Sequence, residues 1–594
     1  MGMSWRLAIC TALILSCFRE VFSNRHEVLE SSLESFQDET DHNVLLQSST
    51  RPAILVSKLP GAAQSAGMQQ AALWTMPNVR SGACLWTYQL LPTGVLLLLM
   101  SIALFLLARR VHQVEVDEAA RSVGSFQQFV GLANYSALIV DSFQLTMAVG
   151  HSAGASGRLI GMYMLGTAIG GVLMWGALKW RLQIWKDWPR QILISVCSSN
   201  LISFILSVWI TSWVTNHADN GQAYGLLCLC RFISGIGHGV GAQLLQVSFA
   251  YLTPVRERPQ QMVRFFFVNT LGIGLGPILV GGVWMLDLCP PGTGHFELSG
   301  IVQCLLAGAS LVGITALYPD LQAFDPEGRT EVSGRSSSKS VSEAARQLGL
   351  ELPEEWNFHK RRIRVCGCLL MALLRAQVTS GVESATSYLL ENKHHWARHE
   401  IGISIGLTFL CCIPAKMVLD YHTNLSVLCK IRIMSVISIM GSLLLYHAGP
   451  VLLLAADILL FPSLYLSDGL SRGLMQQYAL PTGSMLDQNH TTLWAGILSN
   501  GVGRYLGPWL SRLIIEKAGQ PAYCFMQILL ALSFLVIFEA LVAECDLLKS
   551  ILSVEENAIQ EPVKDNAPQE PAKVDEKPQQ AASEPESEKR CAAS

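Results

Sequence analysis

The sequence predicts an all-α membrane protein built from two six-helix bundles, preceded by one extra N-terminal transmembrane helix. Three observations support this prediction. Of the 594 residues, 51% are hydrophobic and 15% are charged, whereas soluble proteins carry about 25% charged residues. Apolar stretches long enough to cross a bilayer recur along the chain. A polar segment near the middle separates two sets of six such stretches.

The first residues, 1–23, have the organisation of a secretory signal. Arg6 precedes an apolar stretch from Leu7 to Phe18, and Val21-Phe22-Ser23 offers a site for cleavage. The apolar stretch is shorter than the ~20 residues that a membrane span needs. A cleaved signal peptide and a retained signal anchor both remain open. Residues 24–88 are polar and are expected to form a lumenal or extracellular segment.

The extra transmembrane helix is predicted at residues 89–110. Its apolar core, from Leu90 to Ala108, is the clearest span in the sequence, and it ends at Arg109 and Arg110. The positive-inside rule places these two arginines in the cytoplasm. The next helix is therefore expected to start on the cytoplasmic side.

The N-terminal six-helix half is predicted at residues 126–318, and the C-terminal half at residues 363–545. Between them, residues 319–362 are rich in Ser and charged residues, which predicts a cytosolic linker. Residues 546–594 are rich in Pro, Glu, Lys and Ala and are predicted to form a disordered cytosolic tail. The twelve spans are expected near residues 127–149, 158–179, 191–213, 223–251, 262–286, 299–318, 365–388, 400–419, 427–446, 449–471, 491–511 and 521–543.

Glycine-rich helices carry the strongest motifs. The fourth helix of the first half contains RFISGIGHG from Arg231 onward, and the fifth contains GIGLGP. Glycines at such spacings let a neighbouring backbone approach closely, while an arginine inside a membrane needs a partner or a water-filled cavity. A similar Gly-Pro element occurs in the eleventh helix. The residues of these structural motifs are Gly235, Gly237, Gly239, Gly272, Gly276, Pro277, Gly281, Gly507 and Pro508.

In this order, the motifs resemble those of the major facilitator superfamily, over roughly residues 126–545. The resemblance implies two halves that rock around a central site, and secondary transport of a small solute. One signature departs from the family pattern, because Trp180 stands where an acidic residue is expected, which puts the salt-bridge latch of the cytosolic gate in doubt. The segments YLTPVRERPQQM and GPILVGG also resemble vacuolar phosphate transporters and their lysosomal relatives, without the SPX domain fused to the former.

The resemblance places the substrate site near the membrane midplane, between the halves. Polar residues in the predicted spans are therefore candidates for a substrate or proton pathway. Asp468 and Arg472, four residues apart on the tenth helix, could pair with each other. The candidates are Asn134, Asp141 and Gln144 on the first helix, Arg231, His238 and Gln246 on the fourth, Arg375 and Glu383 on the seventh, and Arg504 on the eleventh.

Several candidates have a structural alternative. Asn134 and Asp141 are seven residues apart and are expected to share a helix face; Asp141 either takes up protons or faces water at a helix end. Arg231 either binds an anion or an acidic partner, or fixes helix packing. His238 is either linked to protons or a satisfied interior histidine. Glu383 is the first candidate for proton coupling, and its alternative is a salt bridge that stabilises one transport state.

Two functional hypotheses follow. The first is alternating-access transport of a small solute, with protons as a coupling ion; basic residues within the membrane favour an anionic solute, because a desolvated cation stabilises an anion strongly. The second is a non-transporting sensor or scaffold of the same fold, favoured by the altered latch signature and the extra helix.

An enzymatic function is not expected. The sixteen cysteines lie mostly in apolar stretches without a CxxC pair, and no nucleophile–base arrangement or phosphate loop is present. No catalytic residue, cofactor, metal or nucleic-acid partner is predicted. The expected surroundings of this multi-pass protein are a lipid bilayer; an endomembrane or vacuolar location and the plasma membrane are equally compatible with the sequence.

Overall fold

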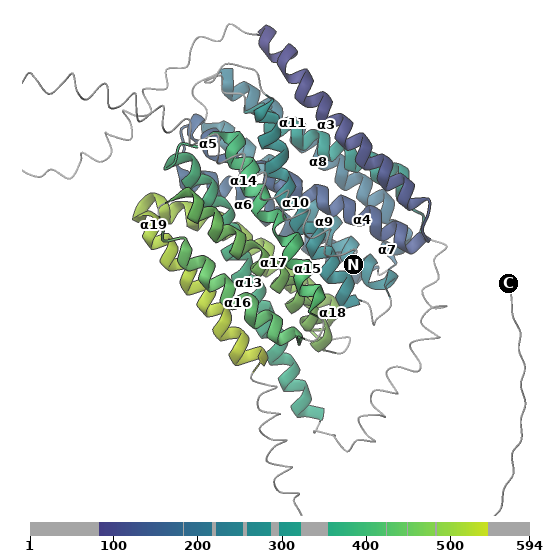
Figure 1. The fold of residues 1–594 in the computed structure, drawn as a ribbon. Coiled ribbons are helices and arrows are strands. Elements are labelled where there is room, and N and C mark those ends of the chain that lie inside the picture. The colour runs from purple at the N-terminus through teal and green to yellow at the C-terminus, as the bar shows by residue number, and fades with distance from the viewer. Residues whose placement is uncertain are drawn as a thin grey trace, which may run out of the picture. The chain divides into compact units, whose positions relative to one another are not determined.

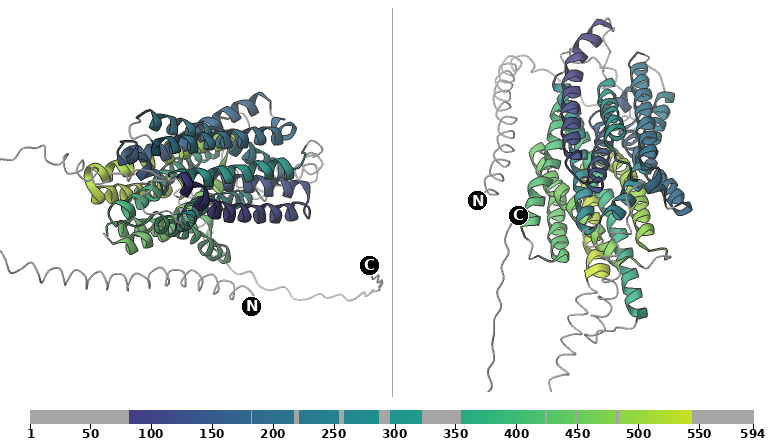
Figure 2. Two further views of the ribbon diagram at one scale, coloured as in Figure 1. Left: turned by 90° about the horizontal axis from the view of Figure 1, so that it is seen from above. Right: turned by 90° about the vertical axis from the view of Figure 1, so that its right-hand side faces the viewer.

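The structure, a computed structural model, describes residues 82–543 except 182, 217–220, 254–257, 287–295, 322–353, 423–424, 448 and 481–483. The secondary structure of these residues is helical, with no strand among them. The axes of the long helices are roughly aligned with one another, as the right-hand view of Figure 2 shows. The predicted signal and tail lie outside the described residues, as do most of the predicted lumenal segment and linker.

Helix α3 (Gly82–Val111) is the predicted extra helix, and it begins earlier than predicted. It lies against α11 (Glu297–Leu317) and α4 (Val116–Ala137), at the edge of the helix array in Figure 1. Leu96 is buried in this contact, whereas Leu98 and Phe105 on the outer face are exposed. An apolar outer face of this length is suited to contact with lipid, and an α-helix meets the bilayer's requirement that backbone polar groups be bonded within the segment.

The N-terminal half comprises α4 to α11. The prediction of one continuous helix at residues 127–149 was wrong, because α4 ends at Ala137 and a separate α5 begins at Ser142. Serine hydroxyls at this break bond to backbone carbonyls: Ser136 to Leu132 and Ser142 to Ile139, an alternative to the regular helix ladder. The remaining elements are α5 (Ser142–Ala148), α6 (Ala153–Trp180), α7 (Ile184–Asp187), α8 (Pro189–Asn216), α9 (Gly221–Leu252) and α10 (Arg258–Met285).

The C-terminal half begins with α13 (Glu354–Asn392), which takes up the end of the predicted linker. Its last long helix, α19 (Arg504–Ile537), is interrupted at Gly519, where φ is 84°; glycine adopts this left-handed conformation without a steric penalty. The other elements are α14 (Arg398–Leu410), α15 (Cys412–Tyr421), α16 (Val427–Leu444), α17 (Pro450–Tyr478), α18 (Gln488–Gly496) and the π-helices η2 (Ile497–Gly503) and η3 (Phe538–Ala543).

Eleven helices in the described residues are long and apolar enough to cross a membrane. Helix α4 is not among them, because it carries Asp117 and Glu118 in its first turn and glutamines further along. One of the eleven runs from His490 to Ala543 and includes the interruption at Gly519. The exact division into six, six and one helices therefore stays a prediction.

The motif glycines lie where helices meet. A Cβ atom at Gly235 or Gly239 of α9 would collide with backbone carbonyl oxygens of α6. The motif of α10 meets α4 at Gly272 and Gly276, and meets α14 at Gly281. Backbone-to-backbone contact of this kind requires the absence of a side chain. These contacts bring the helices that carry the polar residues into close packing.

Candidate functional site

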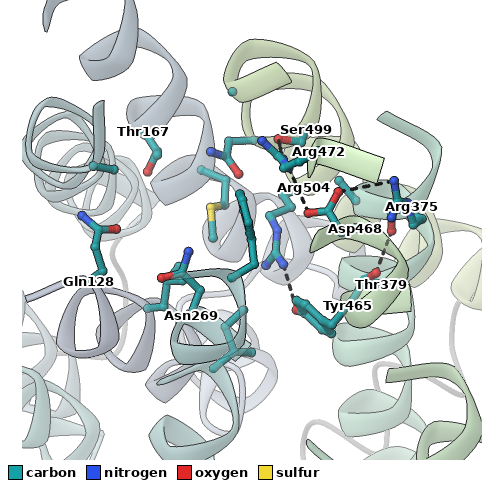
Figure 3. A pocket seen from close by; sticks show the side chains of 18 of the residues that line it. Gln128, Thr167, Asn269, Arg375, Thr379, Tyr465, Asp468, Arg472, Ser499 and Arg504 are labelled. Atoms are coloured by element: carbon teal, nitrogen blue, oxygen red, sulfur yellow. Dashed lines mark hydrogen bonds and ion pairs between the residues drawn. The ribbon is translucent and has the colours of Figure 1, made fainter. Parts of the chain in front are cut away.

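A cavity lies between the two halves (Figure 3). Its volume is about 80 Å³, well below the ~300–1,000 Å³ of typical ligand pockets, so a solute would have to widen it on binding. Following the positive-inside prediction, we call the end where α13 begins the cytosolic end and the opposite end the lumenal end. The polar lining residues are Gln128, Thr167, His238, Gln246 and Asn269 from the N-terminal half, and Arg375, Thr379, Tyr465, Asp468, Arg472, Ser499, Asn500 and Arg504 from the C-terminal half.

Asp468 of α17 joins two arginines of the cavity wall (Figure 3). Its carboxylate lies 3.1 Å from Nε of Arg472 and 3.5 Å from Nη2 of Arg375. Arg472 also donates to the hydroxyl of Ser499 at 3.0 Å, and Arg375 donates to Ser471. The expected pairing of Asp468 with Arg472 is therefore present.

A second network connects Glu383 of α13 with Arg504 at the start of α19. The hydroxyl of Tyr465 donates to Glu383 Oε1 at 2.5 Å, and Arg504 Nη2 donates to the same hydroxyl at 2.8 Å. Arg504 Nη1 lies 3.9 Å from Glu383 Oε1. Glu383 is fully buried behind Tyr465, whereas Arg504 lines the cavity. Among the described residues, Glu383 Oε2 and Arg504 Nη1 have no hydrogen-bond partner.

Arg504 directly follows the π-helix η2. A π-turn holds an additional residue per turn and is frequent at functional sites. Gly503 within η2 lies against the backbone of Leu373 on α13, where a Cβ atom would be too close. The close approach of η2 to α13 brings Arg504 within reach of Glu383.

The N-terminal half contributes neutral polar groups to the cavity. Gln128 and Asn269 lie on the side of the cavity opposite the arginines in Figure 3. His238 is buried, with its ring 5.6 Å from that of Tyr163, and Nδ1 has no hydrogen-bond partner among the described residues. Gln246 also lines the cavity, as a residue of a substrate pathway would.

Arg231 lies outside the cavity, against the end of α4. Its guanidinium donates to the backbone oxygens of Asn134 at 3.2 Å and Tyr135 at 2.9 Å, and it lies over the ring of Tyr163 at 4.8 Å. Carbonyls in the last turn of a helix lack intrahelical partners and attract cations. The guanidinium of Arg231 thus contacts groups of its own half, as expected if it fixes helix packing, and Asn134 lies beside it.

Asp141 and Gln144 lie at the lumenal end and meet Arg398 of α14 in the opposite half. Arg398 lies 3.7 Å from Asp141 Oδ1 and donates to Gln144. Its guanidinium also lies 4.3 Å from the ring of Trp284, whose Nε1 donates to Asp141 at 3.1 Å. Because Asp141 follows the end of α4, the seven-residue spacing does not place it on a common helix face with Asn134.

Arg512 of α19 makes a second connection between the halves. It donates to Ser142 at 2.9 Å and to Ser156, both in the N-terminal half, and to the backbone oxygen of Ser384. Sequence reasoning missed both lumenal arginines. Arg398 begins α14 at the lumenal end, where the positive-inside rule expects few basic residues, and this position is the signal that could have identified it.

At the cytosolic end of α6, the departure from the family signature has a structural counterpart. Trp180 is 92% exposed, so it makes no latch. Arg181 pairs at 3.1 Å with Asp187 in the loop that follows α6. Trp175 contacts His490 of the opposite half, with ring centroids 5.3 Å apart.

A bundle of apolar helices with a polar cavity between two halves is the arrangement that secondary transporters use. Residues 123–484 match the family model of the Major Facilitator Superfamily. The match covers more than half of the chain, and the chain belongs to this superfamily. The protein is thus a multi-pass membrane protein of a superfamily of transporters rather than enzymes.

Solved structures support the same fold. The chain is similar to the partially occluded inward-open xylose transporter XylE from E. coli, with 16% identity, a TM-score of 0.50 and coverage of 72% of this chain and 100% of that chain. It is also similar to the proton:xylose symporter XylE bound to 6-bromo-6-deoxy-D-glucose, with 15% identity, a TM-score of 0.51 and coverage of 72% and 96%. The comparison with curated proteins gave no match.

Proposed function

We propose that this protein transports a small anionic solute by alternating access and couples its movement to protons. The charge of the cavity carries the proposal. Three guanidinium groups (Arg375, Arg472 and Arg504) face two carboxylates (Asp468 and Glu383). If all five are ionised, the net charge is 3 − 2 = +1. In a cavity of low dielectric constant, this charge attracts an anion strongly.

Arg504 is the arginine best placed to bind the solute. It lines the cavity, and its Nη1 has no hydrogen-bond partner among the described residues. Arg375 and Arg472, in contrast, both share Asp468 and also bond to serines. A carboxylate or phosphate of the solute can accept from Arg504 in the bidentate geometry that guanidinium groups favour.

Binding of an anion to Arg504 provides a reason for proton coupling. Arg504 is the cation next to Glu383 and shares Tyr465 with it. When the solute takes over Arg504, the buried Glu383 loses its neutralising partner. A buried carboxylate without a cation is stabilised by binding a proton. The solute and one proton are therefore expected to bind together.

The lumenal end provides the gate of the transport cycle. Arg398 and Arg512 connect the two halves there and hold their lumenal ends together. In the outward-facing state these contacts must separate while the cytosolic ends of the helices approach each other. Within the N-terminal half, the close packing of α9 on α6 and of α10 on α4 at the motif glycines favours movement of that half as a rigid body.

Thermal unfolding of the purified full-length protein tests anion binding. The melting temperature is measured with inorganic phosphate, sulfate, lactate and succinate, and with neutral xylose, at equal ionic strength. At least one anion is expected to raise it, because a ligand at 100 times its Kd adds about 2.7 kcal/mol of stability. Arg504→Gln is expected to abolish the shift. A shift with xylose alone would contradict the proposal.

Proteoliposomes then test transport of the anion that binds. Uptake is expected to increase when the proton concentration is raised on the side of anion addition, and Glu383→Gln is expected to remove this dependence. Binding of the anion without any uptake would instead favour the non-transporting sensor.

A further inference from the structure

A further carboxyl group lies inside the C-terminal half, away from the cavity. Asp457 of α17 is fully buried. Its Oδ1 accepts a hydrogen bond from the hydroxyl of Thr386 on α13 at 3.1 Å. Its Oδ2 has no hydrogen-bond partner, and no Lys, Arg or His forms an ion pair with it, among the described residues. Asp457 therefore lacks the neighbouring arginine that Asp468 and Glu383 each have.

The surroundings of Asp457 are hydroxyl-bearing and apolar. Tyr523 of α19 is a neighbour of Asp457, and the hydroxyl of Tyr523 has no hydrogen-bond partner among the described residues. Glu383 of α13, one helical turn before Thr386, is the charged group that acts on it. From the other helices packed here, α14 contributes the ring of Phe409 and α16 contributes Gly441, next to Ala456.

These surroundings favour a bound proton over a charged carboxylate. An ionised carboxylate in an apolar interior without a cation costs many kcal/mol, and such groups take up a proton instead. A Ca²⁺ or Mg²⁺ ion would need about six oxygen ligands or more, which exceeds what Asp457, Thr386 and Tyr523 supply. The hydroxyl of Thr386 can donate to the carbonyl oxygen of a neutral carboxyl group, so the observed hydrogen bond suits the protonated form.

We propose that Asp457 is a proton-binding site on the lumenal side of the cavity that exchanges its proton with Glu383. Along α17, Asp457 lies about 12 Å from the level of Tyr465, at 1.5 Å per residue, in the direction of the lumenal end. In the exchange, the proton leaves the carboxyl group of Asp457 and binds a carboxylate oxygen of Glu383. Asp457, then ionised, recovers a proton from the lumen. The summed charge of the two groups stays constant during the transfer.

The use of this proton in transport rests on the proposed function, but the protonation of Asp457 does not. This separation matters because Glu383 is paired with Arg504 and hydrogen-bonded to Tyr465 in the same structure. In the solute-free state, Asp457 is therefore expected to be the neutral member of the two carboxyl groups, and Glu383 the ionised one.

Infrared difference spectroscopy of the full-length protein in lipid at neutral pH tests the assignment. The wild type is expected to show the carbonyl stretch of a protonated carboxyl group. Asp457→Asn is expected to lose this band and Glu383→Gln to keep it. Thr386→Val, which removes the donor, is expected to shift its frequency, and this variant keeps the test valid if Asp457→Asn fails to fold. Retention of the band in Asp457→Asn, or an unshifted band in Thr386→Val, would overturn the proposal.

Sodium provides the opposing outcome. If Asp457 held Na⁺ as a carboxylate, NaCl would raise the melting temperature relative to KCl, and Asp457→Asn would remove that rise; this result would refute the proton site. The failure of the proton site and the failure of the proposed function give different results. An infrared band that depends on Asp457, in a protein that binds no anion, would support the proton site and contradict anion transport. Anion binding without such a band would support the anion site and contradict the proton site.

Discussion

The two sides of the cavity differ in chemistry although both are built from helices of similar kind. Every charged lining residue comes from the C-terminal half, whereas the N-terminal half contributes amides, a hydroxyl and His238. Figure 3 shows this division, with Gln128, Asn269 and Thr167 facing the arginines across the cavity. The charge of a solute would thus be recognised by one half and its uncharged polar groups by the other. Binding then requires both halves to close on the same molecule.

The intramembrane arginines illustrate the same division. Arg231 uses its guanidinium on the carbonyls at the end of α4, so it stabilises the N-terminal half. Arg504 keeps one donor without a partner among the described residues and faces the cavity. An arginine in a membrane is therefore not by itself a binding residue: what decides is whether its donors are already used.

The largest expected effect comes from removing the charge of the C-terminal side. Arg504→Gln should lower the affinity for the bound anion by about 30-fold or more, since removing one member of a buried charge pair costs about 2–5 kcal/mol. Isothermal titration with the anion identified by thermal unfolding measures this loss. Arg504→Lys is the matched control and should retain part of the affinity. An unchanged affinity in Arg504→Gln would contradict the assignment of charge recognition to this half.

Replacement of Arg231 should lower the stability of the protein and leave anion binding nearly unchanged. Arg231→Met removes two hydrogen bonds from a charged donor, worth about 1.5–3 kcal/mol each, and leaves the carbonyls at the end of α4 unsatisfied. The melting temperature should fall, while the anion affinity of the folded fraction stays within about twofold of the wild type. A large loss of affinity at unchanged stability would place Arg231 in the binding site instead.

A third variant separates the lumenal gate from the cavity. Arg398→Gln removes the cation between Asp141 and Trp284, so the lumenal ends of the halves should separate more often. Hydrogen exchange measured by mass spectrometry should become faster in α5 and the first turn of α14. Exchange near Arg504 should change less. Equal rates of hydrogen exchange in the wild type and in Arg398→Gln would show that the Arg398 contacts do not hold the lumenal ends together.

The smallest effect should come from the neutral side. Asn269→Ala removes one amide from the cavity, and a neutral hydrogen bond contributes about 1 kcal/mol, equivalent to roughly fivefold in affinity. The affinity for an anion that carries a hydroxyl group should fall by this factor, while the affinity for its analogue without the hydroxyl should stay nearly unchanged. If Asn269→Ala were as damaging as Arg504→Gln, the division of tasks between the halves would be wrong.

Much of the fold could be predicted from local sequence. Glycine spacing indicated which faces of α9 and α10 meet a neighbouring backbone, because only glycine allows that contact. The order of these motifs indicated the family. The break between α4 and α5 could not be predicted, since the guanidinium of Arg231, which bonds to the carbonyls at the end of α4, comes from a distant part of the chain.

Only some of the candidate site residues lie at the cavity. Arg375, Arg504, His238 and Gln246 line the cavity, and Glu383 lies directly behind it. A polar residue in a span can face the cavity, a neighbouring helix or a gate, and helix periodicity does not distinguish these environments. Asp141 and Gln144 therefore lie at the lumenal gate instead, where Arg398 of the other half provides their partner.

The π-helix before Arg504 has a consequence for how this chain tolerates insertions and deletions. One residue of an α-helix corresponds to a rotation of about 100°. Because a π-turn holds about one residue more than an α-turn, loss of a single residue from η2 could restore α-helical geometry and leave the side chain at position 504 directed toward α13. The same loss within a regular helix of the bundle would rotate every residue beyond it by about 100°, so the stretch before Arg504 is the place where this chain can best tolerate a change of length.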